Sequence, residues 1–289
     1  MRFVTLHTAA GLRAAVRLDD HYIDLHATDA AFPPSVRQLL SAGADVLQLA
    51  ARAPKRADAV RVAVAKARLA APIPDPQKII CLGLNYRDHA AETNAPIPRE
   101  PILFSKYPTA LIGPGEAIVL PRVSSEVDYE AELVIVVGKR GRHLTAANAL
   151  DHVAGYTVGH DVSARDWQLK KDGKQWMVGK TFDTFAPVGP ELVTADEVPD
   201  PHNLGIRLRL NGQTMQDSST KQMIFGVAAT LEYLSKVFTL EPGDLIFTGT
   251  PPGVGMARTP PVWLKAGDVT EVEIDGLGLL RNPVVAEPA

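Results

Sequence analysis

The sequence predicts an α+β fold in which short strands form mostly antiparallel or mixed sheets. Beyond residue 75 the chain holds a series of short apolar runs, and only residues 226–238 show the spacing of a long amphipathic helix. The predicted strands do not alternate with helices as in regular βαβ units. With 289 residues, of which 46% are hydrophobic and 22% charged, the chain has the composition of a globular protein with a large core.

Residues 1–75 are expected to form a small N-terminal α/β unit. Short strands are predicted near residues 2–5, 14–18 and 22–25. Ser35 is a typical helix N-cap and Gly43 a typical helix end, so a helix is expected between them. The proline-rich residues 71–76 cannot continue a helix, which places a boundary near residue 75 and a larger unit over residues 76–289.

The larger unit is expected to consist mainly of strands. Its short apolar runs are residues 78–84, 118–120, 133–137, 153–158, 204–210, 244–248 and 269–274. Residues 204–210 alternate with period two and lead into Asn211-Gly212, which is the strongest short signal for a β-hairpin.

Composition narrows the function. The 30 basic and 33 acidic residues give a net charge of -3, so no basic field attracts nucleic acid. No run of 18 apolar residues predicts a membrane helix, and no apolar signal segment is visible near Met1. Cys81, the only cysteine, can form no internal disulfide. We therefore expect a cytoplasmic protein whose partner is a small molecule.

Two carboxylates stand at the start of the strand predicted over residues 133–137. Glu130 and Glu132 are two residues apart, so they point to one face about 6.6 Å from each other. On spacing alone, a solvated polar face is an equal alternative. Val134 and Val136 continue the same face as apolar, which favours a buried rim where the two acids need a partner.

A third oxygen ligand is available from Asp161, which ends the strand predicted near residues 153–160. Three carboxylates suit Mg²⁺ or Mn²⁺ better than Zn²⁺, which favours nitrogen and sulfur ligands. His160 competes with Asp161 for this role, although a histidine in this position is more often a packed side chain.

His89 and Glu92 are spaced to share one face of a helix start. A carboxylate beside an imidazole orients the ring and raises its basicity, which makes a general base. Taken alone, the pair is more simply an exposed helical ion pair.

Residues 249–255 form a glycine-rich loop that is not followed by a helix, so neither a Rossmann nor a Walker motif is present. The loop is expected to present backbone amides and Thr250 to an anionic group, with a plain tight turn as the alternative. No Gly-x-Ser-x-Gly motif occurs and Cys81 lies in an apolar run, which argues against acyl-enzyme chemistry.

Taken together, these segments resemble the fumarylacetoacetate hydrolase family over roughly residues 78–285. The matching blocks, in the family's order, are residues 83–92 (GLNYRDHAAE), 128–132 (DYEAE), 160–166 (HDVSARD), 179–190 (GKTFDTFAPVGP) and 248–255 (TGTPPGVG). Residues 104–106 and 174–176 make the chain most similar to the branch called fumarylacetoacetate hydrolase domain-containing protein two. Bacterial diketo-deoxy-sugar-acid hydrolases are also similar.

The resemblance implies a mixed β-sandwich roll, usually a homodimer, with Mg²⁺ or Mn²⁺ on Glu130, Glu132 and Asp161. It also implies a lid that carries His89 and Glu92 over the substrate. The further candidate residues are Lys180 for catalysis and Tyr86, Arg165, Gln168 and Thr250 for substrate binding.

The leading hypothesis is hydrolysis of a carbon–carbon bond in a small 2-oxo or β-diketo acid of the acylpyruvate or diketo-deoxy sugar acid type. His89, oriented by Glu92, would activate water, and Lys180 would stabilise the departing enolate. The alternative is tautomerisation or decarboxylation of oxaloacetate at the same site. A catalytically silent protein that binds a 2-oxo acid is a third possibility, although such a protein needs no general base.

Overall fold

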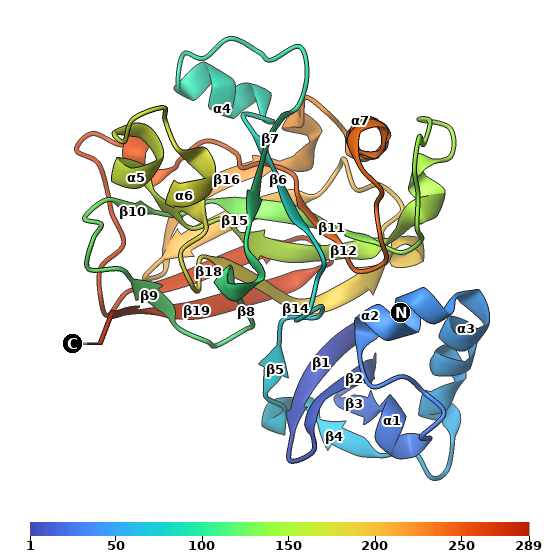
Figure 1. Cartoon of the computed structure of the whole chain (residues 1–289). Coiled ribbons are helices and arrows are strands. Elements are labelled where there is room, and N and C mark those ends of the chain that lie inside the picture. The colour runs from blue at the N-terminus through green and yellow to red at the C-terminus, as the bar shows by residue number, and fades with distance from the viewer. Residues whose placement is uncertain (289) are drawn as a thin grey trace.

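Strands make up most of the regular structure of the computed structural model, which describes residues 1–288 (Figure 1). The strands are β1 (Arg2–Thr8), β2 (Gly11–Leu18), β3 (His21–Asp24), β4 (Arg61–Ala63), β5 (Leu69–Ala70), β6 (Ile79–Gly83), β7 (Ile102–Lys106), β8 (Leu111–Ile112), β9 (Ile118–Leu120), β10 (Val127–Asp128), β11 (Ala131–Val137), β12 (Val153–His160), β13 (Ser163–Ala164), β14 (Ala186–Thr194), β15 (Gly205–Leu210), β16 (Gln213–Ser219), β17 (Leu245–Phe247), β18 (Val269–Ile274) and β19 (Gly278–Ala286). The α-helices are α1 (Leu25–Thr28), α2 (Val36–Ala42), α3 (Ala44–Arg52), α4 (Arg87–Glu92), α5 (Arg165–Leu169), α6 (Trp176–Lys180) and α7 (Val227–Val237). Short 3-10 turns are η1 (Ala53–Lys55), η2 (Val64–Lys66), η3 (Pro108–Ala110), η4 (Ala149–His152), η5 (Ala195–Glu197), η6 (Thr220–Gln222) and η7 (Gly255–Ala257).

The strands form one large and one smaller mixed sheet. The large sheet has the order β4-β3-β2-β1-β14-β12-β11-β17-β6-β7, with β5 beside β1 and β8 beside β14. The smaller sheet has the order β16-β15-β18-β19-β9, and β10 pairs with β13. Most neighbours are antiparallel, whereas β17 with β6, β8 with β14 and β9 with β19 are parallel. The predicted α+β class with mixed sheets is confirmed.

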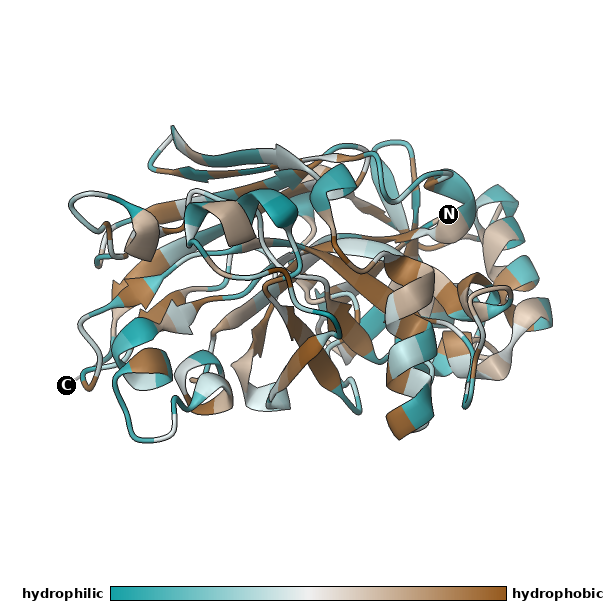
Figure 2. Cartoon of the chain, turned by 90° about the horizontal axis from the view of Figure 1, so that it is seen from above, coloured by the Kyte–Doolittle hydropathy of each residue, from teal (hydrophilic) through white to brown (hydrophobic). Residues whose placement is uncertain are grey.

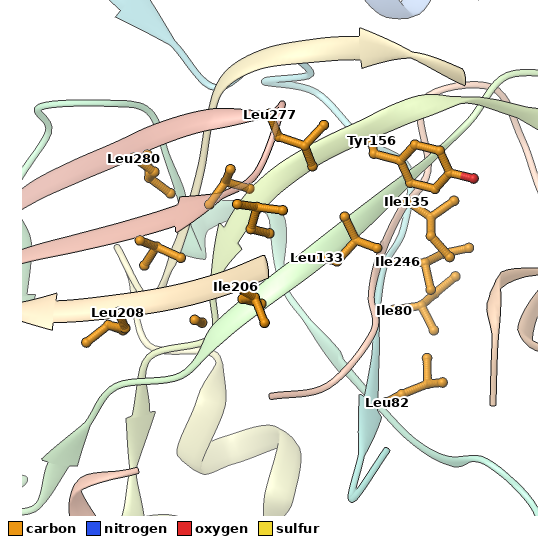
Figure 3. Close-up of a cluster of buried hydrophobic side chains, with 14 of the residues drawn as sticks. Ile80, Leu82, Leu133, Ile135, Tyr156, Ile206, Leu208, Ile246, Leu277 and Leu280 are labelled. Carbon is orange, nitrogen blue, oxygen red and sulfur yellow. The ribbon is translucent and has the colours of Figure 1, made fainter. Parts of the chain in front are cut away.

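The smaller sheet packs against strands β11, β12 and β14 of the large sheet. Leu133 and Ile135 of β11 point into this interface, where they join Ile206 and Leu208 of β15 in one fully buried cluster (Figure 3). Because side chains alternate along a strand, the neighbouring residues of β11 point to the opposite face. Both faces of β11 are therefore buried, and hydrophobic strands fill the middle of the molecule (Figure 2).

The opposite face of β11 packs on the N-terminal unit. Val134 and Val136 belong to one buried cluster with Val36 and Leu39 of α2 and with Phe247. β1 pairs antiparallel with β14, so the strands of the N-terminal unit extend the large sheet. The boundary near residue 75 stays a prediction.

Several elements begin and end where cap residues, a turn motif and hydrophobic spacing in the sequence predict them. Ser35 accepts a hydrogen bond from the Gln38 N–H at the start of α2, and Gly43 follows its last residue. Asn211 and Gly212 have φ values of 53° and 79°, as a tight hairpin turn between β15 and β16 needs. The helix predicted over residues 226–238 is α7. Among residues 1–288, no helix combines the length and apolarity needed to span a membrane.

Phe247 of β17 is fully buried in the cluster that joins β11 to α2, and replacing it tests the packing of this cluster. Phe247→Ala is expected to lower the free energy of unfolding by about 3–5 kcal/mol, because it removes buried apolar surface and leaves a cavity. Urea unfolding measures the change. Val237→Ala, at a side chain that is 61% exposed, is the control and is expected to cost less than about 0.5 kcal/mol. Equal losses in the two variants would contradict this account of the core.

Candidate active site

Four strand ends meet at one end of the large sheet. β11 begins beside the end of β12, because the two strands are antiparallel, and β17 and β6 end next to them. The Asp161 N–H donates to the Glu130 carbonyl over 2.9 Å, which holds the two chain segments together just beyond the strand pair. Residues that follow β12, β17 and β6 therefore lie close to those that precede β11, although they are distant in the sequence.

Glu130, Glu132 and Asp161, here called the carboxylate triad, are brought together at this point. Each offers an oxygen within 4.8 Å of the others, and their exposed fractions are 5%, 1% and 0%. A buried set of three carboxylate oxygens is the ligand chemistry of Mg²⁺ or Mn²⁺. His160 lies outside this set, and neither of its ring nitrogens has a hydrogen-bond partner in residues 1–288. Burial, with Lys106 nearby, lowers the pKa of His160 to about 3.

Lysine and arginine side chains form ion pairs with Glu130 and Asp161, but none in residues 1–288 forms one with Glu132. Burial favours a protonated Glu130, but Lys180 Nζ at 2.6 Å and Arg165 Nη2 at 2.6 Å hold the pKa of this carboxyl well below its usual range. The pKa of Glu132 is raised by burial and by the neighbouring carboxylates of Asp161 and Glu130, against the charge of Lys180 and a hydrogen bond of 2.7 Å from the Gly249 N–H. Glu132 thus lacks a close cation, which a divalent ion held by the triad would supply.

Lys106 is part of this cluster, although sequence reasoning did not select it. Its ammonium is fully buried, lies 2.6 Å from Asp161 Oδ1 and donates to the carbonyls of Val162 and Phe185. It also donates to the Lys180 carbonyl. The available signal was that Lys106 belongs to residues 104–106, one of the segments that make the chain similar to one branch of the family. Lys106 therefore links Asp161 to the backbone of Val162, Lys180 and Phe185.

His89 and Glu92 form a hydrogen-bonded pair on α4, here called the dyad. His89 Nδ1 lies 2.9 Å from Glu92 Oε2, and the Gly253 N–H donates to Glu92 Oε1 over 2.8 Å. Burial works against the charge of Glu92, but these two hydrogen bonds lower its pKa overall. An ionised carboxylate only accepts, so Nδ1 carries the hydrogen of this bond and Nε2 is the ring nitrogen that Glu92 leaves free. His89 is 8% exposed, unlike a surface ion pair.

His89 of the dyad and Glu130 and Glu132 of the triad line one cavity of about 410 Å³. Its lining residues are Leu82, Gly83, Leu84, His89, Thr93, Ala95, Phe104, Glu130, Glu132, Arg165, Gln168, Leu169, Lys174, Trp176, Lys180, Thr250 and Met256. Arg165 bonds Gln168 Oε1 as well as Asp128 and Glu130, so α5 supplies two of the predicted substrate-binding side chains in a fixed arrangement. Tyr86 does not line this cavity: it is fully buried in the core.

The glycine loop, residues 249–255, binds anions that belong to the protein itself. The N–H of Gly249 donates to Glu132, that of Gly253 to Glu92 and that of Gly255 to Asp128 Oδ1 over 2.6 Å. These three amides are therefore engaged by the protein's own carboxylates, and the expectation that the loop holds a substrate carboxylate stays a prediction for its remaining groups. Thr250 remains in the loop as a polar side chain that faces the cavity.

This geometry can be compared with known proteins. The family described as "Fumarylacetoacetate (FAA) hydrolase C-terminal" matches residues 78–285. The chain belongs to the fumarylacetoacetate hydrolase family. It is 52% identical to oxaloacetate tautomerase fahd2, mitochondrial, of Xenopus laevis, over 94% of this chain and 86% of that protein. The family membership expected from the sequence blocks is confirmed, and with it an enzyme of this family.

Two solved structures of family enzymes are also similar. The fumarylacetoacetate hydrolase of Exiguobacterium antarcticum has a TM-score of 0.85 and 37% identity, covering 99% of this chain and 100% of its own. The 2-hydroxyhepta-2,4-diene-1,7-dioate isomerase of Mycobacterium marinum has a TM-score of 0.78 and 36% identity, covering 100% of both chains. The fold therefore serves both hydrolases and isomerases, and it alone does not fix the reaction.

The expectation of a cytoplasmic protein is wrong by this comparison, since the Xenopus laevis relative is named as mitochondrial. The reasoning failed because it searched for apolar segments. Mitochondrial targeting segments are amphipathic and rich in arginine, so the lack of an apolar segment says nothing about them.

Glu132→Gln tests the uneven compensation of the triad. Without metal, this variant is expected to be more stable than the parent protein, because it removes a carboxylate whose ionised form is disfavoured and keeps an oxygen for the Gly249 N–H. Its affinity for Mg²⁺ is expected to fall at least about tenfold. Thermal melting in a chelator and calorimetric Mg²⁺ titration measure the two effects. The control is Glu271→Gln, in β18. A lower melting temperature of Glu132→Gln in the chelator, or an unchanged Mg²⁺ affinity, would contradict this account of the triad.

Proposed function

We propose that this chain is a divalent-metal-dependent tautomerase that interconverts the keto and enol forms of oxaloacetate or a closely related 2-oxo dicarboxylic acid. The observation that carries the proposal is one cavity lined both by His89 of the dyad and by Glu130 and Glu132 of the buried carboxylate triad. The similarity to an oxaloacetate tautomerase at 52% identity favours this reaction over the hydrolysis that the sequence put first.

The proposed cofactor is Mg²⁺ or Mn²⁺, held by Glu130, Glu132 and Asp161. When bound, this ion would supply positive charge that stabilises developing negative charge on an oxygen of the substrate. Lys180 and Arg165 keep Glu130 ionised, and Lys106 and Lys180 hold Asp161 in place. These side chains thus prepare the oxygen ligands before any ion arrives.

Proton transfer is assigned to the dyad. His89 Nε2 takes a proton from C3 of the 2-oxo acid, and the C3–H electron pair becomes the C2–C3 double bond while the carbonyl pair moves to oxygen. Glu92 holds the opposite ring nitrogen and balances the charge of the imidazolium that forms. Return of the proton to the C2 oxygen gives the enol, so no atom is gained or lost.

Hydrolysis of a carbon–carbon bond is the second candidate. The similar fumarylacetoacetate hydrolase structure supports it, and the same histidine can activate a water molecule instead of taking the C3 proton. Decarboxylation of oxaloacetate also passes through an enolate, that of pyruvate, because the C3–C4 bond breaks and carbon dioxide leaves. Release of carbon dioxide therefore separates it from tautomerisation. The homodimer implied by the family resemblance stays a prediction.

His89→Ala tests the assignment of the base. The variant is expected to lower kcat for oxaloacetate tautomerisation by about 10²–10⁴-fold, because proton transfer loses its acceptor, while Mg²⁺ affinity stays unchanged. The decay of enol absorbance measures the rate, and carbon dioxide and acylpyruvate cleavage are followed separately. His152→Ala is the control. If the parent protein cleaves acylpyruvates and leaves the tautomer ratio untouched, hydrolysis is the function instead.

Lys174 is proposed to receive the second carboxylate of a dicarboxylic substrate. It lines the cavity, and in residues 1–288 its ammonium has no ion pair, whereas Lys180 and Arg165 are engaged by carboxylates. Lys174→Met is expected to raise KM for oxaloacetate roughly fivefold and to leave competitive inhibition by pyruvate unchanged. Lys171→Met, which removes an ammonium 4.5 Å from the centre of the Trp167 ring, is the control. Parallel losses for pyruvate and oxaloacetate would remove this role.

A further inference from the structure

Gln216 of β16 is a buried side chain that no sequence motif singled out. Its Oε1 accepts a hydrogen bond from the Ala131 N–H over 2.8 Å. Its Nε2 donates to Thr250 Oγ1 and to the Pro251 carbonyl, each over 2.8 Å. With 1% exposure, the amide uses its oxygen and both of its hydrogens inside the protein.

These partners fix which way the amide faces. The Ala131 N–H requires an acceptor and the Pro251 carbonyl requires a donor, so the oxygen and nitrogen of Gln216 cannot be exchanged. Nε2 has no lone pair to offer, and Thr250 Oγ1 must therefore accept from it. The hydroxyl hydrogen of Thr250 has to point elsewhere.

The cavity is where this hydrogen is available. Thr250 lines the cavity, and its hydroxyl donates to no protein acceptor in the part of the chain that the structure describes. A buried hydroxyl that already accepts one hydrogen bond is held as a donor for the next group that arrives. An anionic oxygen of a bound ligand fits that requirement, whereas the amides of Gly249, Gly253 and Gly255 in the same loop are taken by the protein's own carboxylates.

The same amide also fixes the backbone of the triad. Ala131 stands between Glu130 and Glu132, so its hydrogen bond to Gln216 sets the strand that carries two of the carboxylates. One side chain therefore sets the distance between the Thr250 hydroxyl and the triad, which have to contact one small ligand together.

We propose that Gln216 is a positioning residue that holds the Thr250 hydroxyl as a hydrogen-bond donor to an anionic oxygen of the 2-oxo acid. The inference rests on the proposed function for the class of ligand. It does not depend on which reaction follows binding.

A double-mutant cycle between the two residues tests the proposal. Gln216→Met keeps the length of the side chain and removes its hydrogen bonds, and Thr250→Val removes the hydroxyl. The readout is calorimetric binding of oxalate, which has the adjacent anionic oxygens of a 2-oxo acid, to the Mg²⁺-loaded protein. Gln216→Met is expected to weaken oxalate binding about tenfold in the parent protein and to have no further effect in Thr250→Val.

Two further variants separate positioning from damage to the fold. Gln213→Met makes the same chemical change at an exposed position of β16 and is expected to leave oxalate binding unchanged. Gln216→Glu keeps an acceptor for Ala131 but turns the Thr250 hydroxyl toward itself. Its added charge weakens oxalate binding in either background, so the expected result is a smaller loss of affinity in Thr250→Val than in the parent protein. This variant decides the test if Gln216→Met does not fold.

Equal weakening by the Gln216 variants with and without the Thr250 hydroxyl would overturn the proposal, since it would show a purely structural role. Undiminished binding in Gln216→Met would overturn it as well. Because the cycle measures binding, it gives an answer even if the parent protein lacks tautomerase activity, which would refute the proposed function alone. In the kinetic version, KM for oxaloacetate is expected to follow the oxalate affinity while kcat changes less.

Discussion

Four buried carboxylates lie at the meeting point of the strand ends, where water cannot solvate them: Asp128, Glu130, Glu132 and Asp161. Burying a charge is costly unless it is paired and hydrogen-bonded. The cations of Lys106, Lys180 and Arg165 meet this requirement for three of the four, and they come from β7, α6 and α5. β7, α5 and α6 lie around the cavity in positions from which their cations reach the buried carboxylates. Glu132 makes no ion pair in residues 1–288, and its nearest carboxylates outweigh the charge of Lys180, so a divalent cation would fit there.

The glycine loop was expected to bind an anion of the substrate, and three of its amides bind carboxylates of the protein instead. Its backbone amides do bind anions, as glycine-rich loops often do. The anions are Glu132 of the triad, Glu92 of the dyad and Asp128, which also accepts a hydrogen bond from Arg165. The loop therefore joins the triad, the dyad and Arg165 in one hydrogen-bonded network. A sequence reveals that a loop can offer amides, but not which carboxylate arrives there, because the carboxylates come from two other segments of the chain.

Prediction from the sequence worked where the signal was local. The i to i+2 spacing of Glu130 and Glu132, the hairpin at Asn211-Gly212 and the spacing of α7 each depend on a few neighbouring residues, and the structure has all three. It did not select Gln216 or Lys106, since each acts through contacts with distant segments. Tyr86 belongs to a recognisable block, yet its side chain packs in the core cluster and does not line the cavity, which the block alone does not reveal.

The pairing of β1 with β14 makes the two units one continuous sheet. If residues 1–75 were absent, β14 would become an edge strand with unpaired backbone groups, and the apolar side of β11 around Val134 and Val136 would lose its cover. Exposed strand edges beside hydrophobic surface promote association between chains. The larger unit is therefore a poor candidate for an autonomous module, and swapping N-terminal segments between relatives would require matching both the strand pairing and the apolar contacts at this seam.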